Sequence, residues 1–388
     1  FIRERRDRPH GIVKAETFAF LLQNAGISVD ERDWFFQFSE WRPQGRRTMK
    51  SLTVEQWKEA LFQGELADNA KRMRQINESG MLMMWPDYDH SAVNFEVLFQ
   101  MGFSGMLKRS RVYRGLHEAS GAWDDDKRVF FDAIEIEYQA LLAFLDRVAE
   151  CADQAGGPRC AAMAQALRKL RHGVPETTYE ALLFIWTYFL LSEYVDAIQV
   201  RTYGNLDRIL HPFYRRDLEA GRFDEAQIRE FFRYFMEQSS AMNHYWGHPF
   251  YFGGTKADGE SEINELSYLI LDEYDRMGIY DPKLQIKLSP NTPQAFVDKA
   301  LDMIRRGHNS IVFVNEPATI QRMVSKGIYR YERARAFCVT GCYETSLLDG
   351  GVGTAAIHLN MEKAVELVFY RGRDKKTGHF VGSDTGPL

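Results

Sequence analysis

A short segment, residues 339–344 with the sequence Val-Thr-Gly-Cys-Tyr-Glu, carries the side chains best suited to chemistry. Gly341 permits a tight backbone bend at the end of an apolar run, and Cys342 and Glu344 follow it. A carboxylate beside a thiol disfavours the thiolate, and no histidine lies close in sequence to act as its base. A neutral thiol can instead exchange a hydrogen atom with a carbon, while the carboxylate takes a proton from a neighbouring hydroxyl.

The runs around this segment predict the elements that position it. Residues 283–288 alternate with a period of two, and residues 310–314 and 336–340 are short β-branched or apolar runs, as in strands. Helical patterns over residues 292–307 and 319–326 separate these runs. Strands that alternate with helices predict an α/β fold with a parallel sheet or barrel, in which chemistry lies on loops after the strands. The cysteine segment follows the third run, so we expect it on such a loop.

Helices are predicted for most of the chain before these strands. Pro86 and several turn formers over residues 81–91 indicate a connector, so we expect an N-terminal helical region over residues 1–90 and a barrel domain over residues 91–388. The helical patterns cover residues 92–111, 126–155, 177–195, 224–240 and 360–370, and the fourth of these opens with a capping box of Asp224 and Gln227.

Charge and composition exclude several classes of protein. The 388 residues carry a net charge of −5, which gives no electrostatic footprint for nucleic acid or anionic lipid. The longest apolar run, residues 181–195, is too short to span a membrane and contains Glu193, so we expect a buried helix there. The first residues are charged and lack an apolar signal core, so a cytoplasmic protein is expected.

No metal site is expected. The four cysteines fit no zinc spacing, and Cys151 and Cys160 are interpreted as small apolar residues in the core. His244 and His248 have the helical spacing of a metal pair, but Pro249 argues against a helix continuing there.

The cysteine segment resembles that of the glycyl radical enzymes, the pyruvate formate-lyase-like family. Their loop usually reads Gly-Cys-Val-Glu, and this chain has Gly341-Cys342-Tyr343-Glu344. The resemblance runs from about residue 93 to the end and follows the family's order. The other stretches that carry it are residues 97–105, 178–183, 206–214, 217–221, 264–271, 312–316, 360–367 and 374–378.

This resemblance implies a fold and a mechanism. The fold is an α/β barrel of the pyruvate formate-lyase type, represented here by its N-terminal helical region and first half-barrel, with the cysteine loop near residues 341–346. A separate iron–sulfur activating enzyme that uses S-adenosylmethionine would install a radical on a backbone glycine, and no cofactor would be bound. That radical would take the hydrogen of Cys342, whose thiyl radical attacks a small-molecule substrate. Glu344 would deprotonate a substrate hydroxyl, so that water, an amine or sulfite is eliminated.

The chain departs from the family's pattern in two ways. The glycine-bearing Arg-Val-x-Gly-Tyr pattern is not found in it, which implies either a truncated chain or a separate glycyl-radical subunit. Tyr343 replaces the usual valine and either presents its hydroxyl to the substrate or packs. Because no second cysteine adjoins Cys342, acyl transfer to coenzyme A is not expected, and Cys338 is expected to pack in the sheet.

Further candidates come from stretches that match the family's substrate cavity. His248 is a predicted substrate contact, as are Asp196 and Arg201, the latter for an anionic group. A radical decarboxylase of an arylacetate-like acid is the first alternative function, and a non-catalytic scaffold that needs a radical-bearing partner is the second. The resemblance also implies a homodimer in an anaerobic cytoplasm.

Overall fold

The computed structural model describes residues 1–5, 7–39, 67–84, 90–196, 202–242, 248–327, 329–341, 344–348, 352–353, 357–384 and 386. The chain forms two compact units, which are described separately. The first comprises Phe1–Gly45 and Asp89–Gly353, and the second Arg46–Tyr88 and Thr354–Leu388. The domain boundary predicted near residue 90 stays a prediction.

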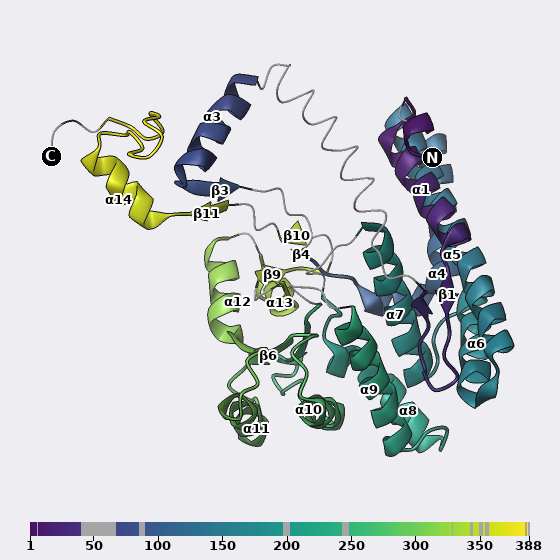
Figure 1. The fold of residues 1–388 in the computed structure, drawn as a ribbon. Helices are drawn as coiled ribbons and strands as arrows, with labels where there is room; N and C mark the ends of the chain where they lie inside the picture. The colour runs from purple at the N-terminus through teal and green to yellow at the C-terminus, as the bar shows by residue number, and fades with distance from the viewer. Residues whose placement is uncertain are drawn as a thin grey trace. The chain divides into compact units, whose positions relative to one another are not determined.

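Helices make up much of the first unit (Figure 1). Helix α5 packs against α1, α4 and α6, and α7 packs against α8 and α9. The capping box of Asp224 and Gln227 opens α9, as predicted. These helices are α1 (His10–Asn24), α4 (Phe95–Ala119), α5 (Asp125–Ala155), α6 (Gly157–His172), α7 (Thr178–Asp196), α8 (Leu206–Glu219) and α9 (Glu225–Ala241).

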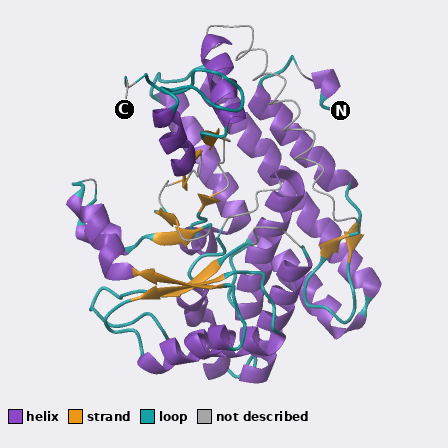
Figure 2. Cartoon of the chain, turned by 60° about the vertical axis from the view of Figure 1, so that its left-hand side comes forward, coloured by secondary structure: helices purple, strands orange, loops and turns teal. Residues whose placement is uncertain are grey.

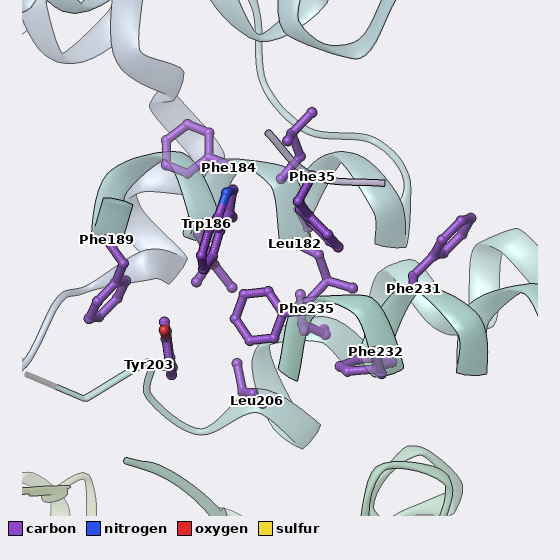
Figure 3. Packing of buried hydrophobic residues seen from close by; sticks show 14 of the residues in the cluster. Phe35, Leu182, Phe184, Trp186, Phe189, Tyr203, Leu206, Phe231, Phe232 and Phe235 are labelled. Atoms are coloured by element: carbon purple, nitrogen blue, oxygen red, sulfur yellow. The ribbon is translucent and has the colours of Figure 1, made fainter. Parts of the chain in front are cut away.

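An aromatic core surrounds α7 (Figure 3). The rings of Phe35, Trp186 and Phe235 lie within edge-to-face distance of one another, at about 6 Å between centroids. Residues 181–186 of α7 are all buried, which confirms the predicted buried helix. The helix is apolar all round because it is covered on every side rather than because it spans a lipid layer. No helix in the described part of the chain has the length and apolar character needed to cross a membrane.

A parallel sheet of three strands follows the helices (Figure 2). Its strands are β5 (Phe250–Gly253), β6 (Leu284–Leu288) and β7 (Ile311–Asn315), in the order β5-β6-β7. They confirm the strands predicted over residues 283–288 and 310–314. The helices that alternate with them are α10 (Glu265–Met277), α11 (Gln294–Arg305) and α12 (Glu316–Ser325).

The third predicted strand is not part of this sheet. Residues Cys338–Thr340 form β8, which pairs antiparallel with β9 (Glu344–Ser346) in a separate hairpin. The expectation of a third parallel strand is therefore wrong. All three residues of β8 are buried, so the run shows no alternation that would reveal its partner. The short helix α13 (Tyr331–Arg335) precedes the hairpin.

The second unit contains α3 (Ala67–Ser79), and its strand β3 (Leu82–Met84) pairs antiparallel with β11 (Ile357–Leu359). Helix α14 (Met361–Phe369) follows β11 and confirms the last predicted helix. Lys363 on α14 binds the carboxylate of Asp374 at 2.7 Å and ties the chain after the helix to it. The smaller elements of the first unit are η1 (Arg3–Arg5), β1 (Ile27–Ser28) paired with β2 (Gln37–Phe38), and β4 (His90–Ser91) paired with β10 (Val352–Gly353).

Candidate active site

The β8–β9 hairpin carries the predicted catalytic segment. Thr340 pairs with Glu344 across the two strands, so residues 341–343 connect two paired positions. Gly341 has a φ of +56°, in the left-handed region that favours glycine, which confirms the predicted bend. Glu344 is half-buried at the start of β9. Cys342 and Tyr343 lie outside the described residues.

A small apolar cluster packs around the residues of the hairpin. Cys338 and Val339 are fully buried there, together with Phe337 and Leu347. Burial raises the pKa of the Cys338 thiol to about 11, so this thiol stays protonated. Cys338 is therefore a packed, neutral residue, as expected. The rest of the cluster comprises Tyr251, Val314, Ile320 and Ala334.

Two polar side chains of β6 hold the two ends of β8. Gln285 Nε2 donates a hydrogen bond to the carbonyl oxygen of Gly341 at 2.9 Å. Lys287 Nζ donates to the carbonyl oxygen of Phe337 at 2.7 Å. Lys287, near the end of β6, thus binds the residue before β8, and Gln285, near the start of β6, binds the residue after β8. The two strands therefore run in opposite directions.

This direction fixes the end of the sheet at which Gly341 lies. Because β8 is antiparallel to β6, Gly341 lies toward the amino-terminal ends of the parallel strands, and Phe337 toward their carboxyl ends. The sequence led us to expect the cysteine segment on a loop that follows a strand of the parallel sheet, whereas Gly341 follows a strand of the separate hairpin. The usual rule applies to loops of the sheet itself, whereas the cysteine segment belongs to a hairpin laid across the face of the sheet.

A buried lysine and a buried glutamate lie near Gly254, and the lysine binds the residue that precedes β8. Lys287 and Glu316 are 4% and 1% exposed. Desolvation lowers the pKa of Lys287 to about 8, although attraction to Glu316 opposes the shift. Glu316 accepts hydrogen bonds from the backbone nitrogen of Thr255 at 3.1 Å and from its hydroxyl. A Cβ at Gly254 would meet Glu316 Oε1 at 3.1 Å and Lys287 Nζ at 3.4 Å, so glycine leaves room for both groups.

Sequence reasoning missed these supporting residues, although a signal was present. Gln285 and Lys287 occupy alternate positions in a run whose other positions are apolar. A strand with polar residues on one face normally turns that face to water. Here both side chains are buried, and each donates a hydrogen bond to a residue that flanks β8.

His248 lies two residues before the start of β5 and is 2% exposed. Its ring lies 5.0 Å from that of Phe189 and 5.6 Å from that of Tyr203. It therefore stands at the amino-terminal end of the sheet, the end toward which Gly341 lies. The side chain of Asp196 and the whole of Arg201 are outside the described residues. The predicted role of each in substrate binding stays a prediction.

The fold is similar to that of a solved glycyl radical enzyme. The crystal structure of a glycyl radical enzyme from Archaeoglobus fulgidus superimposes with a TM-score of 0.83 over 98% of this chain and 56% of that one, at 18% identity. The chain therefore has the pyruvate formate lyase barrel fold. Residues 33–388 match the family Pyruvate formate lyase-like, and the chain belongs to this family.

The curated relatives include dehydratases, sulfite-lyases and a decarboxylase subunit. The chain is 27% identical to (2S)-3-sulfopropanediol dehydratase of Klebsiella oxytoca over 77% of its own length and 39% of the relative. It is 26% identical to trans-4-hydroxy-L-proline dehydratase of Clostridioides difficile over 67% of its length and 36% of the relative. Other relatives are isethionate sulfite-lyases and the glycyl radical subunit of a 4-hydroxyphenylacetate decarboxylase. The chain spans less than two fifths of the length of these proteins.

Proposed function

We propose that this protein is a glycyl radical lyase that eliminates a group from a small hydroxylated substrate. The observation that carries the proposal is the Gly341-to-Glu344 segment at the turn of a hairpin, in a chain of this family. The dehydratases and sulfite-lyases among the relatives support elimination as the reaction class. Cys342 is the proposed hydrogen-atom carrier and Glu344 the proposed base.

The proposed reaction balances in four steps. A glycyl radical formed by an activating enzyme supplies the unpaired electron that reaches Cys342 as a thiyl radical. Cys342 Sγ takes a hydrogen atom from the substrate carbon that bears the hydroxyl, which forms an S–H bond and a carbon radical. Glu344 takes the hydroxyl proton, and the group on the adjacent carbon leaves with its bonding electrons. The product radical recovers a hydrogen atom from Cys342, which regenerates the thiyl radical and releases a carbonyl compound.

The proposal includes the surroundings of this pair. His248, Tyr343 and Asp196 are proposed substrate contacts, and Arg201 is proposed to bind an anionic group such as the sulfonate of the first relative's substrate. An S-adenosylmethionine-dependent iron–sulfur activating enzyme, and either a separate or a linked glycyl-radical segment, are the proposed partners. A homodimer in an anaerobic cytoplasm completes the proposal.

A panel of substrates tests the reaction class. The complete protein, activated without oxygen, is incubated with a 1,2-diol, a hydroxyalkyl sulfonate, hydroxyproline and 4-hydroxyphenylacetate, and the products are identified by mass spectrometry. We expect a carbonyl or dehydrated product with release of water, amine or sulfite. If 4-hydroxyphenylacetate is the one compound that is converted, with release of carbon dioxide, the result would favour the decarboxylase, the alternative that is supported by a decarboxylase subunit among the relatives. A glycyl doublet without turnover of any compound would favour the scaffold.

A variant of the base separates elimination from other radical chemistry. Glu344→Gln keeps the size of the side chain but removes its basicity, so we expect the loss of about 10²–10⁴-fold in turnover. Glu332→Gln, on the exposed face of α13, is the matched control and should retain full turnover. Unchanged elimination by Glu344→Gln would contradict the role of Glu344.

A further inference from the structure

The face of β6 that is covered by the hairpin carries two polar side chains. Leu284 and Ile286 pack in the large apolar core, whereas the alternating residues Gln285 and Lys287 point to the opposite face. Both are buried, with 0% and 4% of their surface exposed. Burying an amide and an ammonium costs free energy unless each finds a hydrogen-bond partner. Apolar side chains would fill the same space without that cost, so stability alone does not account for this pair.

The partner of Gln285 is the residue directly before Cys342. Its amide donates to the carbonyl oxygen of Gly341 at 2.9 Å, inside the protein where water does not compete. Gly341 is the residue with the left-handed backbone at the start of the turn. The hydrogen bond therefore acts on the peptide group that leads into the cysteine.

The partner of Lys287 is the residue at the other end of β8. Its ammonium donates to the carbonyl oxygen of Phe337 at 2.7 Å and lies 3.9 Å from the centroid of the Phe337 ring. Glu316 provides a buried negative charge whose attraction favours the ammonium form. These contacts offset the desolvation of a charged group and tie its position to that of the hairpin.

We propose that Gln285 and Lys287 are positioning residues that set the depth and register of the β8–β9 hairpin, and through it the place of Cys342. Residues 337 and 341 are four positions apart, about 13 Å along a strand, so two fixed points resist both sliding and tilting of β8. The consequence for catalysis rests on the proposed function, because the place of Cys342 matters for turnover only if its sulfur reacts. Hydrogen transfer needs reacting atoms about 3–3.5 Å apart, and a misplacement of about 1 Å can cost about 10²-fold in rate.

Paired variants in the complete, activated protein test this. Gln285→Met and Lys287→Met keep most of the side-chain volume but remove the donors. We expect kcat to fall by about 10–10²-fold in each, with KM changed by less than about threefold and the glycyl doublet at the wild-type level. Lys287→Arg keeps a charged donor and should recover a large part of kcat. Gln294→Met and Lys299→Met, on α11, are the matched controls and should behave as wild type.

Folding is checked for each variant by its thermal unfolding curve. If a Met variant does not fold, Gln285→Asn or Lys287→Gln replaces it, because each shorter side chain withdraws the donor from its carbonyl partner. Reduced kcat with an intact doublet is the expected result in both. Wild-type kcat in folded variants whose side chain at residue 285 or 287 cannot reach its carbonyl partner would overturn the proposal.

A second readout does not depend on turnover. The rate at which iodoacetamide alkylates Cys342 in the resting protein is followed by peptide mass spectrometry. We expect a change of at least about threefold in Gln285→Met and Lys287→Met, because the hairpin loses a fixed point, and wild-type rates in the two controls. If the wild type shows no turnover but the alkylation rates change as expected, the proposed function fails and the positioning role stands. Unchanged rates in both Met variants would contradict the positioning role.

Discussion

Replacing Gly341 by alanine tests the link between the backbone of the turn and activity. The φ of +56° at Gly341 lies in a region that L-residues with a side chain avoid. Gly278 offers a matched control, because its φ of +62° is nearly the same and a Cβ there would meet nothing within 4 Å. It ends α10 and takes no part in the hairpin. The two substitutions introduce the same kind of backbone strain at two different places.

The expected cost follows from this conformation. A left-handed backbone costs a non-glycine residue about 1–2 kcal/mol, so Gly278→Ala should lose that much stability. In Gly341→Ala the strain is relieved if the turn changes its φ, which moves the carbonyl oxygen away from Gln285 Nε2. An energy of about 1–2 kcal/mol corresponds to a factor of about 5–30 in the population of the native turn. We therefore expect turnover to fall by at least that factor.

The assay compares kcat, the glycyl doublet and the thermal unfolding midpoint of the two variants with those of the wild type. Gly278→Ala should lower the midpoint and leave kcat unchanged, whereas Gly341→Ala should lower kcat with the doublet intact. Equal kcat in both variants would refute the view that the backbone of Gly341 determines the position of the reacting group.

Three further predictions concern other parts of the chain. Gly102→Ala should destabilise the protein by about 2–4 kcal/mol, because the φ of Gly102 is +64° and the new Cβ would lie 2.2 Å from the carbonyl oxygen of Gly173. Gly115→Ala in the same helix is the control and should gain up to about 1 kcal/mol of stability. Similar thermal unfolding midpoints in the two variants would contradict the close contact with Gly173. The pKa of Lys287 is lowered to about 8 from the ordinary value of 10.5, so the unfolded chain binds more protons than the folded protein between these two pH values. The stability of the wild type relative to Lys287→Met should therefore rise with pH over this range, by up to about 3 kcal/mol. Denaturant titrations at pH 8 and 10 measure this difference, and equal differences at both would exclude the shift. Cys338→Ala should retain wild-type turnover and lose about 1 kcal/mol of stability, whereas lost turnover in the folded variant would give Cys338 a role that its burial does not indicate.

Local signals in the sequence predicted a large part of the fold. The alternation of residues 283–288 and the β-branched run of residues 310–314 are properties of single strands, and both strands exist. The capping box at Asp224 is likewise a local arrangement of one side chain and nearby backbone. Each depends on neighbours in sequence, which is why one sequence was enough to predict it.

The pairing of β8 could not be predicted in the same way. Its strand partner β9 follows after a short turn, but its placement against the sheet depends on side-chain contacts from Gln285 and Lys287, about fifty positions earlier. The buried run of residues 338–340 carries no alternation that would indicate either. The polar residues of β6 gave an ambiguous signal for the same reason. A glutamine and a lysine on one face normally indicate solvent, and only the hairpin above them shows that they are buried. Cys342 and Glu344 themselves were recognisable because the segment that holds them resembles a family pattern.

The most direct test of the central claim is the Cys342→Ala variant of the complete, activated protein. Electron paramagnetic resonance and product formation are measured on the same sample. The account predicts a wild-type glycyl doublet with no turnover, because the radical forms but has no sulfur through which to reach the substrate. Turnover that persists in Cys342→Ala would contradict it.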